Sequence, residues 1–106
     1  MILDEIAAKT VERIQLQKEK ISLAQIQQQA QALPPKTGFP FEQALKKPGI
    51  SFICEAKKAS PSKGVISQSF PYLEIAKEYE QAGADAISVL TEPHYFLGND
   101  RYLQEI

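Results

Sequence analysis

Apolar residues recur at helical spacing through the first third of the chain. The positions that share this spacing are Leu3, Ile6, Ala7, Val11, Ile14 and Ile21. They fall on one side of a helix, so the pattern predicts a first amphipathic helix. Ser22 is a candidate N-cap for a second helix over Leu23–Leu33, which Pro34–Pro35 ends. The glutamine run from Gln25 to Gln31 is then the solvated face of that helix.

The spacing changes after Pro48–Gly49. Residues 50–56 and 85–90 are short apolar runs rich in β-forming residues, and each is predicted to be a buried strand. Between them, Pro71–Gln81 has helical spacing, and Gly83 follows as a helix stop. A strand, a helix and a second strand predict a βαβ unit with parallel strands and a right-handed crossover.

The pattern at the end of the chain is a helix that has only begun. Residues 101–106 follow a loop at 98–100 and carry no termination signal. We therefore expect the sequence to be the first part of a longer β/α chain. The expected organisation is a helical extension over residues 1–47 and an incomplete β/α portion over residues 48–106.

Composition narrows the class of protein. The 12 Lys and Arg nearly balance the 13 Asp and Glu, so no bulk positive charge favours nucleic acid or an anionic membrane. No apolar run reaches the roughly 18 residues of a membrane span, and no signal peptide is apparent. One cysteine, Cys54, and one histidine, His94, exclude an internal disulfide and a clustered zinc site. We expect a cytoplasmic globular protein without a transition metal.

Two charged residues share one face at the C-terminal end of the first predicted strand, Glu55 and Lys57. In a parallel β/α barrel the active site lies at that end of the strands. A partly buried glutamate suits proton transfer, and a neighbouring ammonium can hold a phosphate or a carboxylate. The alternative is an ion pair that satisfies two buried charges. Spacing leaves both interpretations open.

The loops after the two strands carry further candidates. The segment Lys57–Gly64 combines hydroxyls, ammoniums and a glycine that suit an oxyanion, although it matches no standard phosphate-binding motif. It could equally be an ordinary solvated loop. The segment Thr91–Gly98 places Tyr95 beside Phe96, to cover a bound aromatic ligand or to pack on the N-terminal helices. His94 is expected at the surface.

These segments resemble one known family. Residues 52–64 are similar to the signature segment of the indole-3-glycerol phosphate synthases, and residues 83–98 resemble that family's second-strand segment. The opening residues 2–6 resemble its helical extension. The resemblance implies a (β/α)8 TIM barrel, here truncated after the second strand. It also implies a lyase of tryptophan biosynthesis, an aromatic amino-acid pathway. That enzyme closes the ring of 1-(2-carboxyphenylamino)-1-deoxyribulose 5-phosphate with loss of carbon dioxide and water.

The resemblance also implies roles for individual residues. Glu55 corresponds to a catalytic glutamate and Lys57 to a catalytic lysine near the substrate carboxylate. Ser60 and Pro61 correspond to the substrate-lining loop, and Phe96 to the aromatic side chain on the anthranilate ring. The family needs no cofactor or metal, and its partner is a phosphorylated small molecule.

Other groups of that family come from later strands, which these 106 residues do not contain. We therefore expect no turnover by this chain alone. Unpaired strand edges also lead us to expect self-association. The sequence leaves two alternatives open: another phosphate-binding β/α barrel enzyme, and a non-catalytic helical interaction module that binds through Gln25–Gln31.

Overall fold

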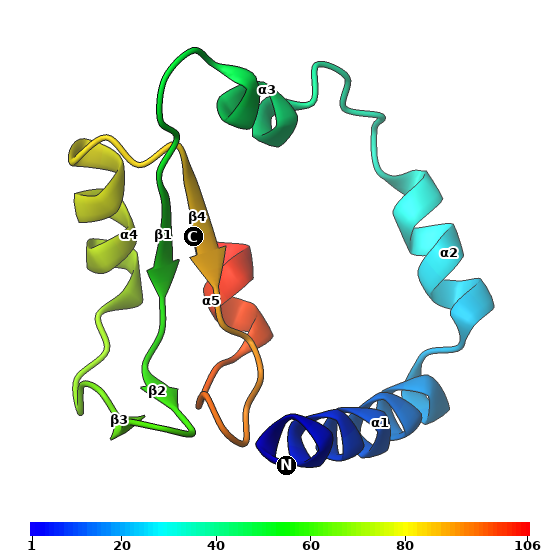
Figure 1. Cartoon of the computed structure of the whole chain (residues 1–106). Helices are drawn as coiled ribbons and strands as arrows, with labels where there is room; N and C mark the ends of the chain where they lie inside the picture. Colours follow the sequence, from blue (N-terminus) through cyan, green and yellow to red (C-terminus); the bar gives the residue numbers. More distant parts are fainter. The chain divides into compact units, whose positions relative to one another are not determined.

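The computed structural model describes all residues from 1 to 106, and they form two compact units, residues 1–38 and residues 39–106 (Figure 1). The first unit holds two helices, and the second holds three helices and four short strands. The short helix α3 (Pro40–Lys46) belongs to the second unit. None of the helices is long and apolar enough to cross a membrane.

Two helices make up the first unit. Helix α1 spans Ile2–Lys20 and helix α2 spans Leu23–Ala32, as the apolar spacing predicts. A capping box starts α2: the Ser22 hydroxyl accepts from the Gln25 backbone N–H at 3.2 Å, and the Gln25 side chain accepts from the Ser22 N–H at 2.8 Å. The glutamine run lies in α2 and is exposed, which confirms the solvated helical face.

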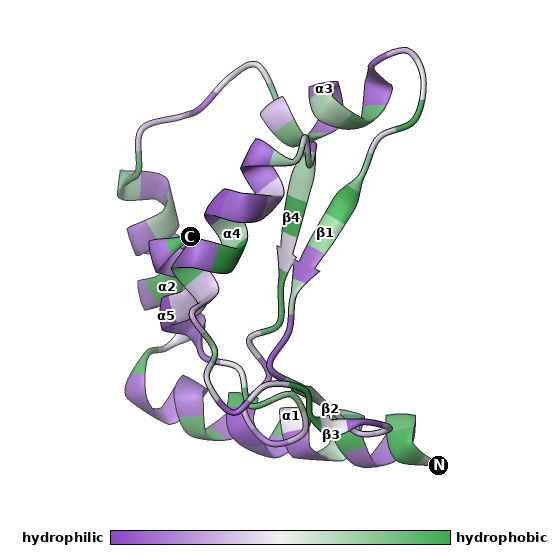
Figure 2. Ribbon diagram, turned by 90° about the vertical axis from the view of Figure 1, so that its left-hand side faces the viewer, coloured by the Kyte–Doolittle hydropathy of each residue, from purple (hydrophilic) through white to green (hydrophobic).

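Apolar side chains of the first unit line a cavity at the junction of α1 and α2. Its volume is about 380 Å³, and Ile14, Ile21, Leu23 and Ile26 form its apolar lining. Neither helix contains a buried residue. Figure 2 shows hydrophilic and hydrophobic bands alternating along both helices. The amphipathic pattern therefore forms the helices without burying their apolar side chains in this unit.

A parallel two-stranded sheet organises the second unit. Strand β1 (Ile53–Ala56) pairs with strand β4 (Ala86–Val89), and Glu55 lies opposite Ser88 in the register. Helix α4 (Tyr72–Gln81) connects them and packs on β1. The predicted strand, helix and parallel strand are confirmed, with each strand shorter at its ends than its apolar run.

The burial predicted for the two strands is wrong. Ile53 is 54% exposed, and Ala56 is the one residue of β1 that is fully buried. A parallel sheet is buried when helices cover both of its faces. Here the sheet has two strands, so each has one edge without a strand neighbour. Ala56, Ala59 and Ala76 are the buried apolar residues of the chain, and they form a small core.

The loop after β1 contains a small hairpin that the sequence analysis missed. Strands β2 (Ala59–Ser60) and β3 (Gly64–Val65) pair antiparallel. Gly64 has φ +63, a left-handed conformation that glycine adopts without strain. A two-residue strand has no periodicity that a sequence pattern could reveal. Both strands are therefore visible only once the loop is folded.

The N-terminal end of the sheet is fastened by Asp85. Its carboxylate accepts a hydrogen bond from the Phe52 N–H at 2.8 Å and forms an ion pair with Lys47 at 2.6 Å. The Lys47 hydrogen bond, then the Phe52 N–H, hold the pKa of the Asp85 carboxyl below its ordinary value. This one side chain therefore joins the end of α3, the start of β1 and the start of β4.

Helix α5 (Asp100–Glu105) follows the loop after β4, as the helical pattern there predicts. The Asn99 side chain caps it by accepting from the Arg101 N–H at 2.8 Å. Tyr102 stacks on Tyr72 with ring centroids 4.2 Å apart, and the Tyr72 hydroxyl donates to Glu105. That hydrogen bond is the main cause of a raised pKa at Tyr72. These contacts join α5 to α4.

Candidate active site

Both candidate loops leave the same end of the sheet. Strands β1 and β4 point in the same direction, and the loops that follow them extend from their C-terminal ends (Figure 1). This is the end at which parallel β/α folds place their ligands. The geometry therefore gathers both segments that carry candidate chemistry at one edge of the second unit.

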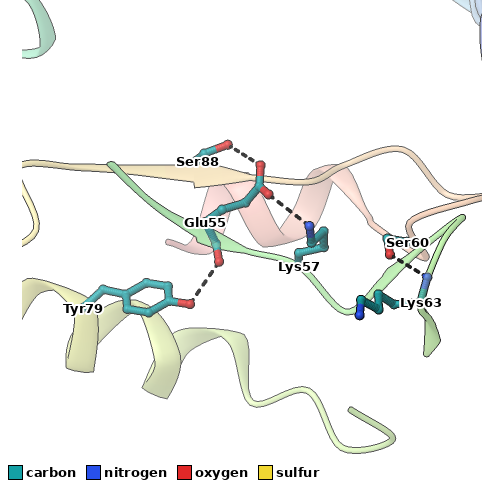
Figure 3. A network of polar contacts seen from close by, with 6 residues as sticks. All are labelled: Glu55, Lys57, Ser60, Lys63, Tyr79 and Ser88. Carbon is teal, nitrogen blue, oxygen red and sulfur yellow. Dashed lines mark hydrogen bonds and ion pairs between the residues drawn. The ribbon is translucent and has the colours of Figure 1, made fainter. Parts of the chain in front are cut away.

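Glu55 lies between two polar neighbours at this edge (Figure 3). Its Oε1 accepts a hydrogen bond from the Ser88 hydroxyl at 3.1 Å, and its Oε2 lies 3.5 Å from the Lys57 ammonium. Ser88 comes from β4, so the contact crosses the parallel pair. Both carboxylate oxygens are therefore engaged, which fixes the orientation of the carboxyl plane.

The Glu55–Lys57 pair is not a buried ion pair. The side chains of Glu55 and Lys57 are 43% and 34% exposed, so the interpretation as two satisfied buried charges is wrong. An ion pair this exposed contributes roughly 0–1 kcal/mol to stability. An ammonium has three donors, so Lys57 keeps donors for a ligand beyond Glu55. The pair is thus better suited to act on a ligand than to stabilise the fold.

A neighbouring helix anchors the backbone of Glu55. The Phe52 and Ala56 carbonyls accept from N–H groups on the β4 side. Because alternate residues of a strand direct their backbone groups to opposite edges, the Glu55 carbonyl faces the other edge. There it accepts from the Tyr79 hydroxyl of α4 at 3.0 Å (Figure 3). Tyr79 thereby satisfies one acceptor on the edge of β1 that no strand covers.

The loop after β1 presents a mixed set of groups. Ser60 is 8% exposed, and its hydroxyl accepts from the Lys63 backbone N–H at 3.2 Å, which closes the hairpin turn. Pro61 lies at the exposed tip of that turn. The ammoniums of Lys58 and Lys63 form no ion pair, so this loop adds free positive charge near Lys57.

Phe96 lies in the loop after β4 and is partly buried. The backbone of this loop is held by Glu92, whose carboxylate accepts N–H groups from His94, Tyr95 and Phe96. Partial burial raises the pKa of the Glu92 carboxyl, but these three N–H donors outweigh it and lower that pKa. His94 is exposed, as the sequence predicts.

The structure thus joins some of the predicted residues and not others. It brings Glu55 and Lys57 into direct contact, whereas no hydrogen bond or ion pair links Ser60, Pro61 or Phe96 to them. The sequence pattern does not reveal the polar partners Ser88, Tyr79 and Glu92. Ser88 could be found only from the strand register, because it is distant in sequence from Glu55.

The arrangement supports acid–base chemistry on an anionic ligand. A carboxylate beside an ammonium can move a proton, and the free lysines can hold a carboxylate or a phosphate. The structure contains no group of three or more His, Cys, Asp or Glu side chains that could hold a metal ion.

Comparison with known proteins assigns the chain to a family. The family model described as indole-3-glycerol phosphate synthase matches residues 3–106. Proteins named indole-3-glycerol phosphate synthase from Ruminiclostridium cellulolyticum and Endomicrobium trichonymphae are 55% and 56% identical over 106 residues, which is 100% of this chain. The protein of that name from Lacticaseibacillus paracasei is 53% identical over the same length. The chain spans 41% of the length of each of these relatives. The matches cover both candidate loops, and the chain belongs to the indole-3-glycerol phosphate synthase family.

Proposed function

We propose that this chain supplies the first two barrel strands, β1 and β4, and part of the active site of an indole-3-glycerol phosphate synthase. The reaction is ring closure of 1-(2-carboxyphenylamino)-1-deoxyribulose 5-phosphate with loss of carbon dioxide and water. The observation that carries the proposal is the Glu55–Lys57–Ser88 cluster at the C-terminal end of β1. Family membership over residues 3–106 supports the same reaction.

Each side chain of the cluster suits one need of that reaction. Ring closure requires a carbonyl to be activated by a proton, and loss of water requires a hydroxyl to depart with one. In the proposal Lys57 holds the substrate carboxylate and supports the acid, because its ammonium keeps donors beyond Glu55. Glu55 assists proton transfer, with its carboxyl plane oriented by Ser88. Ser60 and Pro61 line the ligand, and Phe96 packs on its aromatic ring.

The proposed setting is a (β/α)8 barrel in which β1 and β4 are neighbouring strands. Their parallel register and the connecting helix α4 are the repeating unit of such a barrel. The open edges of β1 and β4 are then where further strands pair. In the absence of such strands, the same edges favour association between copies of this chain. A single free cysteine, Cys54, suits a cytoplasmic location.

A chimera tests the proposed function. This chain replaces the matched 106 residues of the Ruminiclostridium cellulolyticum relative, with which it is 55% identical. We expect the chimera to form indole-3-glycerol phosphate at a rate within about ten-fold of the unaltered relative, because the cluster and both loops are retained. The 106 residues by themselves are expected to show no turnover, since the barrel needs eight strands.

A second chimera controls for misfolding caused by the junction between this chain and the rest of the relative. It uses the Endomicrobium trichonymphae relative, which is 56% identical over the same residues. Each chimera is assayed beside its own unaltered relative, and its folding is followed by circular dichroism. If both chimeras fold as their relatives do and neither forms product, the proposed function is wrong.

A further inference from the structure

The carboxylate of Glu92 is occupied entirely by the backbone of its own loop. Its Oε1 accepts from the His94 N–H at 2.8 Å, and its Oε2 accepts from the N–H groups of Tyr95 at 2.7 Å and Phe96 at 3.1 Å. The Glu92 carbonyl also accepts from the Gly98 N–H at 2.8 Å. This one residue therefore fixes the backbone on both sides of Phe96.

The charge of Glu92 is matched to this task. Although partial burial raises the pKa of its carboxyl, the three N–H donors lower it further than burial raises it. The group is ionised at neutral pH, and hydrogen bonds to an ionised acceptor are about twice as strong as neutral ones. An acid held in this way is a poor proton donor. Glu92 is therefore suited to hold the loop and not to transfer protons.

The backbone in the rest of the loop has little conformational freedom. Leu97 has φ 51, in the left-handed region that a leucine adopts only when its surroundings impose it. A Cβ on Gly98 would lie 2.2 Å from the Leu90 carbonyl oxygen, so the chain returns directly onto the end of β4. The loop is thus closed at Gly98 and capped by Glu92, with Phe96 between the two.

We propose that Glu92 is a positioning residue that sets Phe96 for the aromatic ring of the substrate. The inference rests on the proposed function, in which Phe96 packs on that ring. Glu92 holds the N–H of Phe96 and that of the preceding residue, so it determines the direction in which the phenyl group leaves the backbone. It acts through the loop and does not touch the ligand.

The experiment separates positioning from stability by a double-mutant comparison in the first chimera. Glu92→Gln keeps the size of the side chain but replaces one carboxylate oxygen by an amide N–H₂, so at least one of the three backbone N–H groups then faces a donor. We expect KM to rise about ten-fold with kcat within about two-fold, because a misplaced ring contact weakens binding of substrate and transition state alike. Phe96→Leu is expected to raise KM similarly. The double variant should then equal Phe96→Leu alone, since Glu92 acts through that ring.

A matched control and a second variant complete the design. Glu80→Gln alters an exposed glutamate of α4 whose side chain makes no hydrogen bond or ion pair, and it should leave KM unchanged. Glu92→Asp keeps the charge and should give a smaller rise than Glu92→Gln. Backbone amide exchange at Tyr95 and Phe96 should be faster in both Glu92 variants.

The outcomes distinguish this inference from the proposed function. Inactivity of both unaltered chimeras, when each folds as its relative does, contradicts the proposed function and, with it, the role of Phe96. An active chimera in which Glu92→Gln leaves KM unchanged overturns the positioning role alone. An effect of Glu92→Gln that adds fully to Phe96→Leu also overturns it, because the carboxylate would then act elsewhere. Should Glu92→Gln fail to fold, an unchanged KM in Glu92→Asp with loosened amides has the same consequence.

Discussion

The polar contacts inside the two units of this chain span different distances along the sequence. In residues 1–38 the polar contacts join neighbours three or four positions apart, such as Ser22 with Gln25 and Lys9 with Glu12. In residues 39–106 Asp85 reaches Phe52, and Ser88 reaches Glu55, each across 33 positions. A change in the first unit is therefore expected to stay local, whereas a change in the second should disturb the sheet and the candidate site together.

The largest expected effect tests the chemistry of the second unit. Lys57→Ala in the first chimera should lower kcat/KM at least about 100-fold, because a cation beside the reacting groups is lost. Its ion pair with Glu55 is exposed, so the thermal midpoint should move little. Steady-state kinetics and thermal unfolding measure the two. Lys77→Ala, an exposed lysine of α4, is the matched control. Unchanged turnover in Lys57→Ala would remove it from the site.

The second-largest expected effect tests the contacts of Asp85 at the N-terminal end of the sheet. Asp85→Asn removes the ion pair to Lys47 and weakens the acceptor for the Phe52 N–H, so the thermal midpoint of the 106-residue chain should fall by about 5 °C. Asp4→Asn, at an exposed position in α1, is the equivalent change in the first unit and should shift the midpoint far less. Equal shifts in the two variants would contradict the contrast between the units.

The pKa of Asp85 adds a pH dependence to this prediction. Its folded-state pKa is lowered by Lys47 and the Phe52 N–H, so its stabilisation is complete above the ordinary aspartate pKa of about 3.9. That stabilisation is lost as the pH falls below this value through the folded-state pKa. Acid unfolding of Asp85→Asn should therefore be less steep than that of the unaltered chain. An unchanged acid transition would show that Asp85 is not stabilised by these contacts.

A smaller effect concerns the orientation of the Glu55 carboxylate. Ser88→Ala removes the hydrogen bond to Glu55 Oε1, while Lys57 still faces Oε2. Because water can replace the Ser88 hydroxyl at this partly exposed carboxylate, the loss should cost no more than a typical hydrogen bond, about 0.5–1.5 kcal/mol, and kcat/KM in the chimera should fall about three- to ten-fold. Ser88→Thr keeps the hydroxyl and should retain most of the activity. A fall as large as that of Lys57→Ala would mean that Ser88 contacts the ligand itself.

The smallest effect is the loss of a local cap. Ser22→Ala removes one half of the capping box of α2 and should destabilise that helix by about 1 kcal/mol. The change should appear as lower helicity in the circular dichroism of the 106-residue chain, with the activity of the chimera unaltered. Gln28→Ala, on the exposed face of α2, should affect neither quantity. Loss of activity in either variant would show that the first unit is coupled to the site.

The sequence predicted the elements of this chain better than their burial. Apolar spacing indicated all the longer helices, and the two apolar runs indicated both strands of the parallel pair. It failed at the hairpin of residues 59–65, where each strand has two residues and no period exists to detect. It also predicted buried strands, which is wrong for these residues. An apolar run indicates that a strand can be covered, but it does not indicate which elements cover it.

The contacts of the candidate site were likewise predicted only in part from the sequence. Glu55 and Lys57 are two positions apart on one strand, so alternation alone places them on one face. Ser88 and Tyr79 reach Glu55 from distant positions, and those contacts depend on the register of β1 with β4 and on the packing of α4.

The sequence by itself thus determined the local features of this protein: the amphipathic helices, the cap at Ser22, and the pairing of Glu55 with Lys57. These depend on interactions within a few residues, which the order of side chains specifies directly. Tertiary structure alone decided the orientation of Glu55 by Ser88, the fastening of the sheet by Asp85 and the close return of Gly98 onto β4. Each of those requires two segments to meet at a defined register, and only the folded chain sets that register.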